Sequence, residues 1–167
     1  MSIEADGSQI ARQEERLQFG HFDAREAWIV GARIKTLAEG RHQQVAIEIG
    51  LFGQRLFFYA MPGTTPDNAE WIRRKANVVA RFQRSSYAIG RRLEQQGQSL
   101  EGRWGLVTAD YAAKGGAFPL VLAGTGCVGF IGVSGLPQRQ DRELVVAALA
   151  ERLGQPLDEL ALPDEAV

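Results

Sequence analysis

The sequence predicts an α+β domain built on an antiparallel β-sheet with helices beside it. Two pairs of short apolar segments carry this prediction, because each pair is joined by a glycine-containing turn, as in a β-hairpin: residues 43–61 and residues 117–135. Segments with helical periodicity stand before, between and after the two pairs. This order differs from the alternating βαβ arrangement of nucleotide-binding folds.

Length and composition indicate one domain that needs no metal or disulfide staple. The 167 residues are 45% apolar and 23% charged with a net charge of −1, so the molecule has no bulk attraction to nucleic acid or to an anionic membrane. The single cysteine, Cys127, excludes an intrachain disulfide. We divide the chain into a polar N-terminal extension (1–17), one domain (18–154) and an acidic C-terminal tail (155–167). We expect both end segments to lie on the surface, the first of them loosely, with a short helix as an alternative.

Neither a secretory leader nor a membrane span is predicted. The N-terminal stretch MSIEADGSQIARQEER is polar and lacks the apolar segment of a secretory signal. No apolar run approaches the roughly 20 residues that cross a bilayer. We therefore expect a cytoplasmic protein that contacts no membrane.

A helix is predicted from Asp23 to Gly40, followed by the first hairpin. Asp23 can cap the helix, and apolar residues recur at helical spacing up to the terminating Gly40. In residues 45–51 large apolar residues alternate with small or polar ones, which indicates a half-buried strand. The partner segment RLFFYAM (55–61) is apolar on both faces, so we expect other elements to cover both of its sides.

Three further helices are predicted, over residues 65–82, 85–97 and 137–154. The first of these can begin with Thr65 as the cap and Pro66 as the first helical residue, or with Asp67 as the cap, and the sequence does not choose between them. Residues 99–116 form a long connection without a firm period. Pro119 places the strand that contains it at a sheet edge or at a bulge.

Glycines are concentrated in GTGCVGFIGVSG (124–135), which contains a G-x-G-x-x-G match that begins at Gly124. A dinucleotide fingerprint needs a helix directly after its glycines, whereas the residues that follow Gly129 have the composition of a strand. Glycines 129, 132 and 135 alternate between the two faces of that strand. They leave room either for close packing under a helix or for a flat ligand or partner subunit, and both interpretations stay open.

A candidate ligand site lies where two glycine turns are expected to meet. Lys114 stands just before Gly115 and Gly116, and Ser134 and Gly135 stand just before the last helix. Pairing of the two strands in the second hairpin would bring both turns to the same end. Backbone N–H groups in glycine turns and at helix starts can bind an anion. We predict that a carboxylate or phosphate binds here, with an exposed lysine that holds no ligand as the alternative.

Three motifs give the chain a family resemblance. GTTPDNAEWIRRKANVVARFQRSSY (63–87), GGAFPLVL (115–122) and GFIGVSGLPQRQDRELVVAAL (129–149) resemble a bacterial and fungal branch of the haem-degrading-domain superfamily, which includes GlcG and HbpS proteins. The resemblance runs from about Leu17 to Leu153. It implies a profilin-like α+β fold with an antiparallel sheet, assembly into homodimers or larger rings, and binding or breakdown of haem or a related tetrapyrrole.

Two positions depart from the family pattern. Relatives usually carry histidine where this sequence has Lys114 and Arg142. Histidine can ligate iron and titrates near neutral pH, whereas lysine and arginine do neither readily at pH 7. Neither position can therefore supply a metal-bound imidazole. Lys114 and Arg142 are instead cations that could pair with a propionate or phosphate group. The predicted ligand-binding residues are Lys114, Gly115, Gly116, Ser134, Gly135 and Arg142.

Five further side chains are candidates for a pocket or an interface. Asn68, Trp71 and Lys75 lie on neighbouring turns of one predicted helix and could wall a cleft or seal a dimer. Tyr87 and Tyr111, like Cys127 and Met61, could in principle ligate haem iron. None of the four stands in a motif that assigns this role.

The remaining residues with reactive or charged groups predict no metal site and no catalytic residue. His21 and His42 are not spaced as metal ligands. Cys127 lies in an apolar strand, which is typical of an inert buried thiol. The segment 70–92 is rich in arginine, and we interpret it as a solvated or intersubunit face and not as a nucleic-acid site, because the arginines spread around two helices.

Three functions are compatible with these patterns. The first is a homo-oligomeric protein that binds a small or flat anionic ligand, with haem as one candidate, at the glycine turns. The second is an assembly module in which the glycines serve subunit packing and no small ligand binds. The third is an enzyme that degrades haem, as the family resemblance implies.

Overall fold

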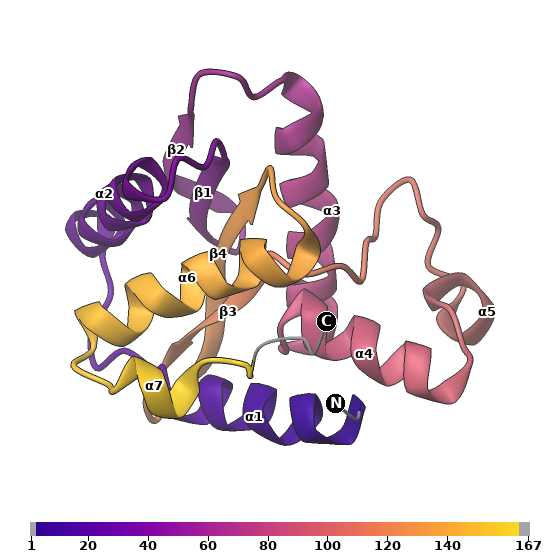
Figure 1. The fold of residues 1–167 in the computed structure, drawn as a ribbon. Coiled ribbons are helices and arrows are strands. Elements are labelled where there is room, and N and C mark those ends of the chain that lie inside the picture. The colour runs from indigo at the N-terminus through magenta and orange to yellow at the C-terminus, as the bar shows by residue number, and fades with distance from the viewer. Residues whose placement is uncertain (1–2, 164–167) are drawn as a thin grey trace.

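An antiparallel sheet of four strands forms the centre of the molecule (Figure 1). A computed structural model describes residues 3–163. The strands are β1 (Ala46–Leu51), β2 (Gln54–Ala60), β3 (Ala117–Leu122) and β4 (Gly126–Ser134), in the order β2-β1-β4-β3. The helices are α1 (Ile3–Arg16), α2 (Ala24–Gly40), α3 (Pro66–Phe82), α4 (Ser86–Gln96), α5 (Leu100–Trp104), α6 (Gln138–Arg152) and α7 (Leu157–Leu160). The predicted α+β class with an antiparallel sheet and flanking helices is confirmed.

Helices cover the sheet from two sides. Ile47 of β1 and Ile131 of β4 point into the main core, which they share with Val30 of α2 and Leu144 of α6. Side chains alternate between the faces of a strand, so Gly132 lies on the opposite face, where Ile72 of α3 packs against it. The sheet is therefore a middle layer with α2 and α6 on one face and α3 on the other.

Local sequence signals set the helix boundaries. The Asp23 side chain accepts a hydrogen bond from the Glu26 N–H (2.9 Å), as the cap of α2. Of the two predicted starts for α3, the structure has the first, with Pro66 as the first helical residue and the Thr65 N–H bonded to the Asn68 side chain (2.9 Å). This arrangement satisfies backbone donors that a helix start leaves without a partner.

The first hairpin has the predicted strands, but the expectation that both faces of β2 are covered is wrong. β2 is an edge strand. Phe57 is buried beneath α2, where its ring lies 5.8 Å from that of Trp28, whereas Phe58 and Tyr59 are exposed. β2 is thus rich in apolar residues although neighbouring elements cover only part of it.

The glycines of the second hairpin meet the protein's own atoms. A Cβ on Gly129 would lie 2.0 Å from the Gly50 carbonyl oxygen, and one on Gly132 would lie 2.8 Å from Ile72. Close packing under a helix is thus confirmed for Gly132, and that helix is α3. No helix follows Gly129, which lies within β4, so the dinucleotide motif is excluded.

The two ends of the described chain are more ordered than the sequence predicts. Residues 3–16 form α1, which buries Ile10 against Tyr87 and Leu162. The C-terminal segment adds α7, and Leu160 joins the main core. Among residues 6–16, the buried face of α1 contains one apolar residue, Ile10, and the C-terminal segment buries two leucines, Leu160 and Leu162, which is too short an apolar pattern to predict packing. A short helix, α5, also lies in the connection that has no periodic signal. Within residues 3–163, no helix is long and apolar enough to cross a membrane.

Candidate functional site

Two adjoining pockets lie beside α3. The polar pocket, with a volume of about 420 Å³, lies between α3, the end of β4, the loop before β3 and the start of α6. The apolar pocket, about 440 Å³, lies between α3, α4 and the connection from α5 to β3. They share Trp71, Lys114 and Gln138. We call the two pockets together the cleft.

Most of the predicted site residues meet in this cleft. The polar pocket contains residues from both groups of candidates: Asn68, Trp71, Lys75, Lys114, Gly115, Ser134 and Gly135. Tyr111 lines the apolar pocket. Gly116 adjoins the site beneath Lys75. The hairpin explains the gathering: β3 pairs with β4, and the Val133 N–H donates to the Gly116 carbonyl (2.9 Å), which holds the two glycine turns together.

The glycines of the site allow the backbone segments to approach closely. A Cβ on Gly115 would lie 2.1 Å from the Gln138 carbonyl oxygen, and one on Gly135 would lie 2.3 Å from the Gln44 carbonyl oxygen. Gly116 has φ +130°, which residues with a side chain rarely adopt. These glycines therefore shape the walls of the polar pocket, and a side chain at any of the three would distort them.

A buried ion pair lies at the floor of the polar pocket. The Lys75 Nζ donates to the carbonyl oxygens of Gly115 (3.0 Å) and Val133 (2.6 Å) and lies 3.3 Å from Asp141 Oδ2. The other carboxylate oxygen of Asp141 accepts from the Leu136 N–H (3.0 Å). Lys75 thus fixes both glycine turns, and its three donors are satisfied by these acceptors.

Burial governs the titration of this pair. It raises the pKa of Asp141 to about 6, although the attraction of Lys75 acts in the opposite direction. Burial also lowers the pKa of Lys75, because a charged ammonium loses its hydration there. A carboxyl group that changes its charge near neutral pH therefore lies at the floor of the polar pocket.

Lys114 is the cation that the site leaves accessible. It is exposed, and no hydrogen bond or ion pair joins it to another residue within the described part of the chain. The Ser134 hydroxyl, which lines the same pocket, lies 3.4 Å from the Asn68 amide nitrogen. Lys114 and these two polar groups therefore border one space in which an anionic group can bind.

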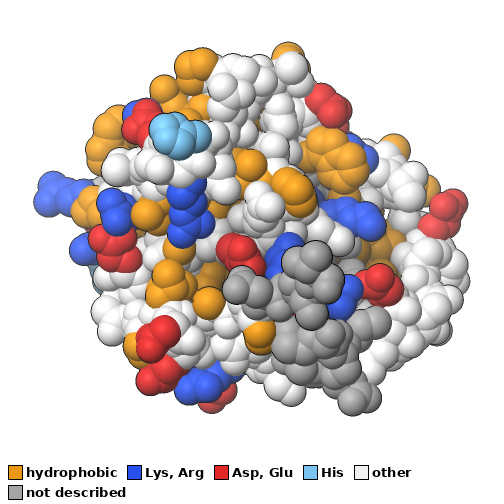
Figure 2. All heavy atoms as spheres, in the orientation of Figure 1, with side chains coloured by type: hydrophobic (Ala, Val, Ile, Leu, Met, Phe, Trp, Pro, Cys, Tyr) orange, Lys and Arg blue, Asp and Glu red, His pale blue; other side chains and the backbone are white. Residues whose placement is uncertain are grey.

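The apolar pocket supplies flat and aliphatic surface. Leu93, Leu100 and Trp71 line it, and the Arg74 guanidinium lies 4.1 Å from the ring centroid of Trp71. Figure 2 shows hydrophobic side chains with Lys and Arg side chains beside them over the region of α3 and the connection next to it. A planar apolar group with an acidic substituent matches this combination of aromatic, aliphatic and cationic surface.

The structure places Arg142 and Tyr87 outside the cleft, which corrects the predicted set. Arg142 is only 2% exposed and lies on the inner side of α6. Its guanidinium donates to the Ser85 hydroxyl (3.0 Å) and lies 5.3 Å from the Tyr87 ring centroid. The spacing of residues in α6 explains the error, because Asp141 faces the polar pocket and the next residue points elsewhere.

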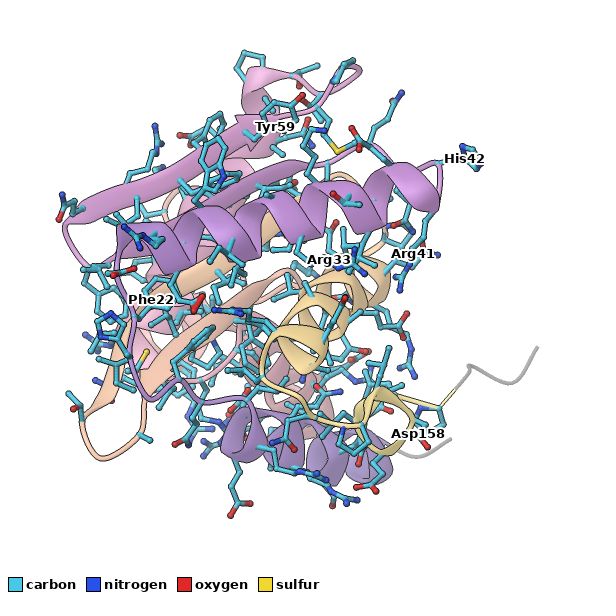
Figure 3. The ribbon with its side chains drawn as sticks, turned by 90° about the vertical axis from the view of Figure 1, so that its left-hand side faces the viewer. Phe22, Arg33, Arg41, His42, Tyr59 and Asp158 are labelled. Atoms are coloured by element: carbon cyan, nitrogen blue, oxygen red, sulfur yellow. The ribbon has the colours of Figure 1, made fainter. Side chains whose placement is uncertain are left out.

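The cleft contains none of the usual nitrogen or sulfur ligands of haem iron. His21 is exposed beside Asp23, and Figure 3 shows His42 pointing outward beyond the end of α2. Cys127 donates to the Gly129 carbonyl oxygen near the second hairpin turn, and Met61 is buried in the main core. Among the described residues, no group of three or more His, Cys, Asp or Glu side chains could hold a metal ion.

Several arginines of the basic segment 70–92 form ion pairs within the chain. Arg73 pairs with Glu70 (3.1 Å) and Asp110 (3.2 Å). Arg84 pairs with Glu14. These acids come from three different segments, which is why the sequence of 70–92 alone suggests an unbalanced positive face.

Among the cleft residues that the sequence did not predict, which include Gln138, Asp141 has the clearest role in the site. It lies in the first turn of α6, where an acidic residue is a common response to the helix dipole. Its bond to the Leu136 N–H spans five residues, so a local capping pattern is present in the sequence. Its pairing with Lys75, 66 positions earlier in the chain, requires the tertiary fold.

Comparison with known proteins places these features in a family. Residues 22–150 match the model of the family described as haem degrading protein HbpS-like. A UPF0303 protein from Azotobacter vinelandii is 54% identical over 162 residues, which cover 97% of this chain and 98% of the relative. A UPF0303 protein from Serratia proteamaculans is 53% identical over 157 residues, which cover 94% and 98%.

Solved structures share the fold. The crystal structure of the Ybr137w protein superposes with a TM-score of 0.81 at 25% identity and covers 89% of this chain and 87% of that one. The crystal structure of HbpS gives a TM-score of 0.63 at 23% identity, covering 83% and 94%. A PduOC:heme complex gives 0.67 at 19% identity, covering 77% and 93%. The likeness to the last two concerns the fold alone.

Proposed function

This chain belongs to the HbpS-like family of haem degrading proteins, and on that premise we propose that its cleft binds a small, flat, anionic ligand. Haem or a related tetrapyrrole is the first class to test, because the family description and the heme complex of a structural neighbour both point to it. The proposal concerns binding and assigns no catalytic residue.

The position of Lys114 between the two pockets, without a partner among the described residues, carries the proposal. An anionic substituent placed beside it also reaches the Ser134 hydroxyl and the Asn68 amide in the polar pocket. The ring that carries this substituent then lies in the apolar pocket against Trp71. Burial of the apolar ring and the pairing of its acid with a lysine act together, as in most small-molecule sites.

The side chains of the cleft can contact the carboxylates and the flat face of a tetrapyrrole. Within the part of the chain that the structure describes, they include no imidazole that could ligate its iron. Of the described residues that line the cleft, Tyr111 alone has one of the usual ligand side chains of haem iron, and none is a histidine, cysteine or methionine. We therefore infer that recognition rests on the ring and its carboxylates. Iron then contributes little to the affinity.

A titration with two porphyrins tests this proposal. Haemin and iron-free protoporphyrin IX are each added to the purified protein, and binding is followed by tryptophan quenching and by the Soret band. We expect both to bind with dissociation constants within about threefold of each other. Lys114→Glu should weaken both at least tenfold, which corresponds to about 1.4 kcal/mol. Arg25→Glu, a charge reversal on the exposed surface of α2, is the matched control and should change neither.

Other results would change the assignment. Absence of binding by both porphyrins would refute the proposal for this ligand class. Tight binding of haemin alone, unaffected by Lys114→Glu, would show that the iron is recognised elsewhere. Loss of the Soret band over time after addition of a reductant would assign haem breakdown, the third function considered from the sequence.

Self-association is a second candidate function, and one surface favours it. The edge strand β2 exposes Phe58 and Tyr59, and α2 beside it exposes Trp28, 67% of whose surface is accessible. Figure 3 shows Tyr59 on β2 alongside α2. An open strand edge with apolar neighbours pairs readily with a second copy of the same strand. We propose that a homodimer, or a larger ring built from it, forms through this surface.

Native mass spectrometry and sedimentation velocity test the assembly. Phe58→Glu should shift the population toward monomer at micromolar concentration, because it places a charge in the apolar contact. Val107→Glu is the matched control, since Val107 is also exposed but lies on the connection after α5. A wild-type protein that is monomeric at all concentrations would contradict the proposal, as would equal effects of the two substitutions.

A further inference from the structure

Helix α1 turns acidic side chains toward the protein interior. Asp6, Ile10, Gln13 and Glu14 recur at helical spacing and are all buried, with Asp6 only 4% and Glu14 only 8% exposed. α1 also lies outside residues 22–150, the part of the chain that matches the family model. A helix that buries two carboxylates and one isoleucine differs from the usual amphipathic helix, whose inner face is apolar.

Both buried carboxylates of α1, Asp6 and Glu14, contact arginines on the body of the protein. Asp6 Oδ2 lies 3.2 Å from Arg139 and 3.5 Å from Arg91. Glu14 pairs with Arg84, and its other oxygen accepts from the Ser85 N–H (3.0 Å). Ser85 caps α4, an 11-residue helix, so the Glu14 carboxylate lies at a helix N-terminus, where anions are stabilised.

Arg142 lies beneath α1 and is not fully satisfied by it. One of its terminal nitrogens donates to the Gln13 side chain and the other to Ser85. Its Nε is buried and has no hydrogen-bond partner among the described residues. Asp6 Oδ1 and Arg91 Nε are also buried without a hydrogen-bond partner among the described residues. The fit between α1 and these arginines is therefore incomplete.

The contacts of α1 with the body are mostly polar, and besides its ion pairs they include hydrogen bonds from the Gln9 and Gln13 side chains to backbone carbonyls of the C-terminal segment. Ile10 is its one buried apolar side chain among residues 6–16. Buried ion pairs gain little over the hydration they lose, and the pairs of Arg12 and Arg16 with Glu159 on α7 are partly or largely exposed. A helix held mainly by such pairs can open locally while the rest of the protein stays folded.

We propose that α1 is a built-in occupant of a second ligand site, formed by Arg84, Arg91, Arg139 and Arg142 with the N-terminus of α4. The ligand class follows from what α1 places there. Asp6 and Glu14 are eight residues apart, about 12 Å along a helix axis, and Ile10 lies between them against Tyr87. The matching compound carries an oxyanion at each end of an apolar spacer, as a long-chain dicarboxylate does. This site adjoins the cleft at Arg91, which also lines the apolar pocket, but the proposal does not depend on the ligand of the cleft.

Thermal unfolding of a double variant tests the proposal. Asp6→Asn with Glu14→Gln keeps the shape of α1 but removes the two charges that occupy the site. Decanedioate at millimolar concentration should raise the unfolding midpoint of this variant by several degrees and that of the wild type by less, because in the wild type α1 competes for the site. Butanedioate, which has the same charge and a short spacer, and sodium chloride at equal ionic strength should give much smaller shifts.

Two controls make the result specific. Glu15→Gln removes an exposed carboxylate from the same helix and should behave as the wild type does. Adding Arg84→Gln and Arg91→Gln to the double variant should abolish the effect of decanedioate. An equal response to decanedioate and butanedioate, or a response that survives loss of the arginines, would overturn the proposal.

Hydrogen exchange of the wild type provides a second measurement if the double variant does not fold. Decanedioate should speed exchange in residues 3–16, because α1 is displaced, and slow it at the start of α4. No change in either segment would show that the arginines and acids form structural ion pairs only.

Discussion

Lys75 and Asp141 form an almost fully buried ion pair. Lys75 Nζ lies 3.3 Å from Asp141 Oδ2, and only 3% and 4% of the two side chains are exposed to solvent. The pair joins α3 to α6 directly beneath the predicted ligand site. Because Lys75 also bonds to both glycine turns, the shape of the polar pocket depends on this one contact.

The stability of the protein should depend on pH through Asp141. Its pKa of about 6 in the folded protein lies above the ordinary value of 3.8, so the folded state binds a proton that the unfolded state does not bind between these values. The contribution of Asp141 is therefore fully present below pH 3.8 and is lost as the pH rises through about 6. Relative to Asp141→Asn, the free energy of unfolding of the wild type should rise by about 1 kcal/mol from pH 7 to pH 5, as measured by urea denaturation. The opposite slope would mean that Lys75 holds the pKa of Asp141 low.

Replacement of Lys75 should be among the most destabilising substitutions in the chain. Lys75→Met removes the donor to two carbonyl oxygens and leaves Asp141 buried without its cation, which should cost about 3–5 kcal/mol. Asp141→Asn in the same chain should restore part of this loss, because the uncompensated charge is then gone. Urea denaturation of the wild type, the two single variants and the double variant measures the coupling energy between Lys75 and Asp141. If the losses of the two single variants simply add in the double variant, the two residues are not coupled and the prediction is contradicted.

Two glycines of β4 should respond differently to alanine. Gly129→Ala places a Cβ 2.0 Å from the Gly50 carbonyl oxygen, which belongs to the neighbouring strand and cannot move freely. Gly132→Ala meets the Ile72 methyl at 2.8 Å and the Phe130 ring at the ordinary contact distance of 3.5 Å, and both are side chains that can shift. We expect a loss of about 3 kcal/mol or more for Gly129→Ala and about 1 kcal/mol for Gly132→Ala. Gly40→Ala, which has nothing within 4 Å, is the control, and a reversed order would contradict the packing described.

Stiffening α1 should make it harder to open. Gly7 lies inside α1, and a Cβ at this position would meet nothing within 4 Å, so Gly7→Ala should stabilise the helix by up to about 1 kcal/mol. Hydrogen exchange in residues 3–16 should slow by up to about fivefold, while exchange in β4 stays unchanged. An unchanged rate in α1 would mean that its amides exchange without separation of the helix from the body.

The sequence is informative wherever the signal is local. The cap of α2 at Asp23 and both hairpins follow from neighbouring residues, and the structure confirms them. Pairing within the second hairpin is also sufficient to bring Lys114 and Ser134 to one pocket. The order of the strands is beyond such reasoning, because β1 and β4 are far apart in the chain and nothing in their composition identifies them as neighbours.

Polar residues on buried surfaces account for most of the errors. Asp6, Gln13 and Glu14 are typical of solvent-exposed positions, so a periodicity of apolar residues cannot show that α1 packs through them. The charge of Arg142 predicts contact with a ligand, yet groups from α1 and α4 bury it. Conversely, the apolar residues of β2 predict burial, whereas the strand lies at an edge.

The position of β4 between β1 and β3 has a consequence for synthesis on the ribosome. The first hairpin is complete once residue 60 has emerged, but the inner edge of β1 has no partner until residue 134 follows. At ordinary translation rates this interval lasts roughly 4–15 s. During it, the nascent chain exposes an unpaired strand edge beside apolar side chains, and chaperones that recognise such surfaces would have their opportunity to bind then.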